Sequence, residues 1–119
     1  MNRRILGAAF WLAVAVTLTL ALLPHPPLVI PNANDKEQHM LAFGVLTLLA
    51  SGYYGLGRTL LIFISLAGLG GLIEVLQMIP ALHRDAEWLD WAADCATVLA
   101  TLVVCRVAAW IYNLADDGP

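Results

Sequence analysis

Charged residues are scarce in this chain: they make up 13% of its 119 residues, against 61% that are hydrophobic. A soluble domain of this size needs a larger polar surface than six basic and nine acidic residues can cover. The composition therefore predicts that lipid surrounds most of the chain. A length of 119 residues leaves no room for a separate soluble module, so we expect one domain over residues 1–119.

Basic charge, cysteine and the common catalytic motifs are also sparse or missing. The net charge of −3 gives no basic surface for nucleic acid, which we exclude as a partner. Cys95 and Cys105 lie ten residues apart on one predicted helix, roughly 15 Å from each other, too far for a disulfide. There is no Cys-x-x-Cys, Gly-rich phosphate loop, Ser-x-x-Lys or Gly-x-Ser-x-Gly. We therefore expect no metal and no cofactor, and we favour a protein that is not an enzyme.

What the chain does have is long apolar runs. Four of them, at about residues 5–23, 36–55, 59–79 and 89–114, are long enough to cross the hydrocarbon core of a bilayer as helices. A proline-rich stretch from Pro24 to Pro31 ends the first run, and Pro80 ends the third. The first run is longer than the apolar part of a signal peptide and lacks a small-x-small cleavage site, so we interpret it as a retained helix. The predicted fold is an all-α integral membrane four-helix bundle with short loops.

The positive charges predict how this bundle lies in the membrane. Those expected on one side are Arg3, Arg4, Arg58 and Arg106, and those on the other are Lys36 and Arg84. Positive charges concentrate on the cytoplasmic side of membrane proteins. We therefore expect both termini in the cytoplasm, with the proline-rich loop and the Arg84 loop outside. The corresponding localisation is the bacterial inner (cytoplasmic) membrane, as a multi-pass protein.

Small residues repeat at four-residue spacing on two of the predicted helices. They are Ala67 and Gly71 on the third, and Ala92, Ala96 and Ala100 on the fourth. Such patterns let helix backbones approach closely in lipid, where no hydrophobic force drives the helices together. We expect these residues to pack helix against helix.

Polar residues that lipid should exclude form the candidate site. They are Asp35, Lys36 and His39 on the second helix, Glu74 and Gln77 on the third, Arg84 in the next loop, and Asp90 and Asp94 on the fourth. Spacings of three or four residues put the members of each helix on one face. Because successive helices alternate in direction, we expect all of them at the outer end of the bundle. The first helix is expected to add almost nothing to this cluster.

Two interpretations of the cluster are open. An ionised carboxylate inside a membrane costs about 2–3 kcal/mol on insertion scales, so it persists when it is paired, protonated or needed for function. In the structural interpretation, Lys36 and Arg84 neutralise the acidic residues and fix the order of the helices. In the functional one, Lys36 and Arg84 hold an anionic group, while His39, Glu74 and Asp94 orient it or move a proton. The excess of acidic over basic residues in the cluster also leaves room for a bound cation, although no spacing here is that of a known metal motif.

The polar residues also resemble a known family. Asp35-Lys36-Glu37-Gln38-His39, with Phe43 one turn later, resembles the Asp-Lys-x-x-His-x-x-x-Phe signature of VanZ-like membrane proteins. Glu74-Val75-Leu76-Gln77 is similar to their Glu-x-x-Gln, and Arg84 with Asp90 and Asp94 to their Arg…Asp-x-x-x-Asn segment. Asp94 replaces the family's asparagine, and Thr97 a frequent glycine. The resemblance covers about half of the chain, residues 35–97, and implies a small protein of the cell envelope.

The functional hypotheses follow from the cluster and the resemblance. The first is a pocket at the outer membrane face that recognises the head group of a membrane lipid, an anionic lipid or a cell-wall precursor. The VanZ-like family is named for a member linked to teicoplanin resistance, which the resemblance implies as a related role. The alternative is a non-catalytic accessory or structural subunit of a larger membrane protein complex. A transporter ranks third, because four spans without inverted repeats or broken helices suit alternating access poorly.

Overall fold

The computed structural model describes residues 2–24 and 35–116, although the side chains of residue 35 and of residues 114–116 lie outside that description. The described chain forms α1 (Arg3–Leu22), α2 (Asp35–Tyr54), α3 (Thr59–Gln77) and α4 (Trp88–Asp116). Two short 3₁₀ turns, η1 (Leu56–Arg58) and η2 (Pro80–Leu82), precede and follow α3. No strand occurs among the described residues, so the all-α prediction is confirmed. Most of the predicted proline-rich loop lies outside the description.

Three of the four helices are long and apolar enough to cross a membrane. They are Arg3–Leu22, Leu56–Gln77 and Trp88–Asn113. α2 is not among them, because charged residues at its start lower its hydropathy. Phe43, Leu46 and Ala50 on α2 are each only 1% exposed, and this helix packs against both α1 and α4. The prediction of four helices is therefore confirmed, and that of membrane-spanning length and composition is confirmed for three.

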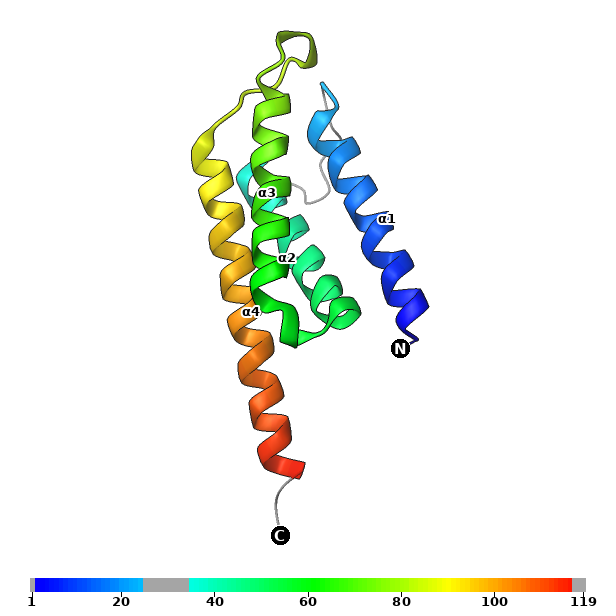
Figure 1. Ribbon diagram of the computed structural model, residues 1–119. Helices are drawn as coiled ribbons and strands as arrows, with labels where there is room; N and C mark the ends of the chain where they lie inside the picture. The colour runs from blue at the N-terminus through cyan, green and yellow to red at the C-terminus, as the bar shows by residue number, and fades with distance from the viewer. Residues whose placement is uncertain (1, 25–34, 117–119) are drawn as a thin grey trace.

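Successive helices run in opposite directions (Figure 1). The C-terminal ends of α1 and α3 and the N-terminal ends of α2 and α4 therefore meet at one end of the bundle, which we call the polar end. At the other end, α4 extends beyond its neighbours (Figure 1). Its 29 residues span about 43 Å, more than the roughly 30 Å of a hydrocarbon core.

The outer surface of the bundle is strongly apolar. Leu60 is 71% exposed, Leu12 66% and Val104 64%, and they belong to three different helical segments. The interior is also apolar and is built from residues such as Phe10, Phe43, Ile73, Val98 and Leu102. A bundle that is apolar inside and outside is the arrangement that a lipid environment requires.

At the end opposite to the polar end, two arginines form hydrogen bonds between neighbouring helical segments. Arg3 donates from Nε to the Tyr53 carbonyl oxygen at 3.2 Å, and its guanidinium lies 5.6 Å from the centre of the Tyr53 ring. Arg106 donates from Nε to Thr59 Oγ1 and from Nη2 to the Leu56 carbonyl oxygen, both at 3.1 Å. The grouping of Arg3 and Arg106 at one end of the bundle therefore agrees with the sequence analysis.

The small residues lie on two different kinds of surface. On α3, the Ala67 carbonyl oxygen accepts a hydrogen bond from Trp91 Nε1 of α4 at 2.9 Å, and a Cβ at Gly71 would lie 3.5 Å from that nitrogen. On α4, Ala96 and Ala100 are exposed and Ala92 is half-buried. The face of α4 that enters the bundle is formed instead by Asp90, Asp94, Val98 and Leu102, at four-residue spacing.

A candidate polar site at one end of the bundle

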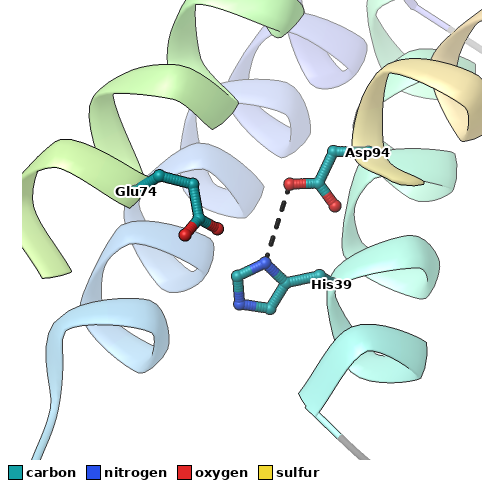
Figure 2. A group of neighbouring side chains, drawn as sticks. All are labelled: His39, Glu74 and Asp94. Atoms are coloured by element: carbon teal, nitrogen blue, oxygen red, sulfur yellow. Dashed lines mark ion pairs between the residues drawn. The ribbon is translucent and has the colours of Figure 1, made fainter. Parts of the chain in front are cut away.

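Three side chains from three helices meet inside the polar end. Figure 2 shows His39 of α2, Glu74 of α3 and Asp94 of α4, with both carboxyl groups lying near the imidazole ring. His39 Nδ1 lies 3.6 Å from Asp94 Oδ2. One nitrogen or oxygen atom from each residue lies within 4.8 Å of those of the other two. His39 and Glu74 are 8% exposed and Asp94 is 1% exposed, so this His39–Glu74–Asp94 triad is buried inside the bundle.

Glu74 is held by the loop that leads into α4. Its Oε2 accepts a hydrogen bond from the backbone N–H of Glu87 at 3.0 Å. Its other oxygen, Oε1, is buried and has no hydrogen-bond partner among the described residues. A buried acceptor of this kind costs free energy unless a ligand, a proton or water satisfies it.

A second polar pair lies above the triad, nearer to the end of the bundle. Lys36 Nζ is 3.9 Å from Asp90 Oδ1, and the Lys36 side chain is 41% exposed whereas that of Asp90 is 6% exposed. Lys36 precedes His39 by three residues, and Asp90 precedes Asp94 by four, which places this pair about 4.5–6 Å farther along the helices. Polar side chains therefore lie in two layers between the half-exposed Lys36 ammonium and the buried triad.

The end of α1 joins this region through its backbone. The last four carbonyl groups of a helix have no partner within the helix. Gln77, itself 1% exposed, donates from Nε2 to the Ala21 carbonyl oxygen at 2.9 Å. Arg84 Nη1 donates to the carbonyl oxygens of Leu20, at 3.2 Å, and Leu23, at 3.0 Å. The expectation that the first helix adds almost nothing was therefore wrong, because α1 supplies the acceptors that position Gln77 and Arg84.

The eight predicted site residues are thus brought together to different degrees. His39, Glu74 and Asp94 form the triad, and Lys36 and Asp90 form the layer above it. Gln77 and Arg84 are directed toward α1, and the side chain of Asp35 lies outside the described residues. The Glu87 backbone amide and the carbonyls at the end of α1 were not predicted, because backbone groups leave no side-chain pattern. One signal was available in the sequence. A helix that ends before a proline-rich loop has free carbonyl groups in its last turn, and these need hydrogen-bond donors from elsewhere.

An apolar cavity of about 300 Å³ lies farther from the polar end, between α1, α2 and α3. Phe10 and Val14 of α1, Tyr54 of α2, and Leu66 and Leu69 of α3 line it. Leu69 precedes Glu74 by five residues, which is about 7.5 Å along the helix. The cavity therefore lies at least about 7.5 Å from the triad along α3.

The charges limit what the triad can hold. Two carboxyl groups and one imidazole, with Asp90 close by, favour a cation, a proton or a hydrogen-bond donor over an anion in direct contact. Histidine and carboxylate are also common metal ligands and proton carriers. An anionic ligand would have to meet Lys36 at the exposed layer.

Comparison of the chain with protein-family models, with curated proteins and with solved structures finds no match. The resemblance to VanZ-like proteins, which depends on short polar motifs, therefore stays a prediction.

Proposed function

We propose that this chain is a VanZ-like, multi-pass protein of the bacterial inner membrane that binds the polar head group of a lipid or lipid-linked cell-wall precursor. The binding site is the polar end of the bundle, at the outer face of the membrane. The observation that carries this proposal is the burial of His39, Glu74 and Asp94 together inside a bundle whose outer surface is apolar.

The energetic cost of the triad supports a functional role. Ionisable residues inside membrane proteins are expensive and mark ligand or proton sites by default. A purely structural role is better served by apolar side chains, because replacing a buried ion pair with apolar residues is often neutral or stabilising. The unsatisfied Glu74 Oε1 gives the triad a remaining acceptor for a ligand hydroxyl or amine.

Lys36 is the residue that meets the anionic part of the ligand. Its half-exposed side chain lies nearer to the end of the bundle than the triad, and its Nζ is 3.9 Å from Asp90 Oδ1. Arg84 has a different role, since its Nη1 donates to the carbonyl oxygens of Leu20 in α1 and of Leu23 just after it, and so fixes the end of α1 against the loop between α3 and α4. The apolar cavity between α1, α2 and α3 accommodates part of an acyl or prenyl chain.

Lipid retention tests the proposal. The purified chain is reconstituted with a mixture of anionic and zwitterionic bacterial lipids, and bound lipids are identified by native mass spectrometry after mild detergent exchange. We expect one class of phosphate-bearing lipid to stay bound to the native chain and to be lost from Lys36→Ala and Glu74→Gln. Asp85→Asn, in the exposed loop, is the control and keeps the lipid. Equal retention by all four proteins would contradict head-group binding at the polar end.

Cysteine labelling tests the orientation. In a Cys95→Ser/Cys105→Ser background, a single cysteine is placed at Asp85 or at Asn113, both of which are exposed and lie at opposite ends of the bundle. We expect a membrane-impermeant maleimide to label Asp85→Cys in spheroplasts, and Asn113→Cys only after lysis. The reverse pattern would put the polar end in the cytoplasm.

A second candidate function is a non-catalytic accessory subunit of a larger membrane protein complex. The exposure of Ala96 and Ala100 on α4 favours it, because this small-residue face is not used inside the bundle. Extraction in mild detergent tests this function. A partner recovered in fixed ratio with the native chain, and lost with Ala96→Leu, would support it, whereas recovery of the chain alone would count against it.

A further inference from the structure

We infer that the His39–Glu74–Asp94 triad is a binding site for one divalent transition-metal ion, of the class of Zn²⁺, Mn²⁺ or Fe²⁺. This assignment differs from the sequence-based expectation of no metal, which depended on the lack of a local ligand motif. The ligands here come from three helices, so no local motif marks them.

The geometry provides three ligands around one point. One imidazole nitrogen and one oxygen from each carboxyl group lie within 4.8 Å of one another. Three ligand atoms bound to a single ion at about 2.0–2.2 Å lie about 3.0–3.8 Å from one another, so an ion would draw the three side chains together by up to about 1 Å. Figure 2 shows that the three side chains come from different helices and converge. Three protein ligands would leave at least one position of a four-coordinate ion open.

The second observation is the state of Glu74. This residue is 8% exposed, and its Oε1 has no hydrogen-bond partner among the described residues, while Oε2 is held by the Glu87 amide. The backbone hydrogen bond orients the carboxyl group through one oxygen and leaves the other oxygen available to a ligand. Hydrogen-bonded carboxylates of this kind are typical of metal sites, where the outer partner fixes the orientation of the ligand.

The charges of the ligand set agree with a divalent ion. Two carboxylates and one neutral imidazole carry a charge of −2, which one M²⁺ ion cancels in a region where uncompensated charge is costly. A mixed imidazole and carboxylate set suits Zn²⁺, Mn²⁺ and Fe²⁺ better than Ca²⁺ or Mg²⁺, which prefer oxygen ligands alone.

A metal ion would also explain how an acidic cluster contributes to binding an anionic head group. A phosphate oxygen can occupy an open coordination position while Lys36 contacts the same group from the exposed layer. This last step rests on the proposed function, whereas metal binding itself does not.

Metal titration of the purified full-length chain tests the inference. The chain is placed in lipid nanodiscs and stripped of metal with a chelator. It is then titrated with Co²⁺, whose visible absorption reports binding, and Zn²⁺ is added to compete with the bound Co²⁺. We expect one ion per chain, and at least about tenfold weaker binding in Glu74→Gln, His39→Gln and Asp94→Asn, because each removes a ligand. Asp85→Asn, an exposed carboxylate one loop away, is the matched control and binds as the native chain does.

The outcomes separate the metal site from the proposed function. No binding of Co²⁺, Zn²⁺ or Mn²⁺ by the folded native chain would overturn the inference, and so would native-like affinity in any one of the three ligand variants that folds. If one variant fails to fold, the affinities of the other two variants decide the outcome. The native chain is also tested for a rise in its unfolding midpoint on addition of Zn²⁺, which metal binding to the folded chain requires. Metal binding without lipid retention would refute head-group recognition and leave the metal site standing.

Discussion

The contact between Gln77 and the end of α1 gives a prediction that can be worked out from the structure. Gln77 is 1% exposed and donates to the Ala21 carbonyl oxygen at 2.9 Å. Gln77→Met keeps a similar side-chain volume and removes the donor. Leaving a buried carbonyl unsatisfied costs about 1–3 kcal/mol.

Part of this cost is offset within the same side chain. Gln77 Oε1 is buried without a hydrogen-bond partner among the described residues, and the substitution removes that atom as well. We therefore expect a net loss of about 1 kcal/mol in the free energy of unfolding, roughly a fivefold change in the folding equilibrium. The loss should be accompanied by faster hydrogen exchange in the last turn of α1.

The free energy of unfolding is measured by circular dichroism in mixed micelles of increasing sodium dodecyl sulfate content. Hydrogen exchange in the last turn of α1 is measured by mass spectrometry. Asn113→Met is the matched control, since it replaces an exposed amide at the opposite end of the bundle from the last turn of α1 and should change stability by less than about 0.5 kcal/mol. A Gln77→Met variant that matches this control in both measurements would refute the role given to α1.

Other predictions concern the contact between α3 and α4. A Cβ at Gly70 would lie 3.3 Å from the Trp91 ring and 3.4 Å from Asp94 Oδ2, whereas a Cβ at Gly68 would meet open space. Gly70→Ala should therefore lower the free energy of unfolding by about 1 kcal/mol, and Gly68→Ala should raise it by about 0.5–1 kcal/mol through helix propensity. If both variants change this free energy by a similar amount and in the same direction, the contacts at Gly70 do not matter. Trp91→Phe removes the hydrogen bond to the Ala67 carbonyl oxygen and should cost about 1 kcal/mol, and an unchanged unfolding curve would contradict that contact.

The meeting of the polar residues could be predicted because it follows from local periodicity. Lys36 with His39, and Asp90 with Asp94, share helix faces by spacing alone, and alternating helix directions bring these faces to one end. The same reasoning gave the all-helical fold, since apolar runs of this length have few alternatives in lipid. Neither inference needed long-range information.

The remaining features depend on how the helices are rotated against one another, which spacing does not determine. The alanine stripe of α4 gave no sign that Ala96 and Ala100 would be exposed while Asp94 and Val98 enter the bundle. The role of α1 was missed because its contribution comes from carbonyl groups, which every residue carries. The position of Glu74 beside the Glu87 amide depends on the path of a loop, and no residue pattern specifies that path.

The central claim is that the triad is retained to bind a ligand rather than to stabilise the bundle. The most direct measurement compares the unfolding free energy of the native chain with that of the triple variant His39→Gln/Glu74→Gln/Asp94→Asn, each with and without Zn²⁺. We predict that the triple variant is at least as stable as the native chain in the absence of metal. We also predict that only the native chain gains stability from Zn²⁺. A triple variant that is destabilised by more than about 3 kcal/mol, together with a native chain that Zn²⁺ does not stabilise, would contradict the claim and identify the triad as a structural element.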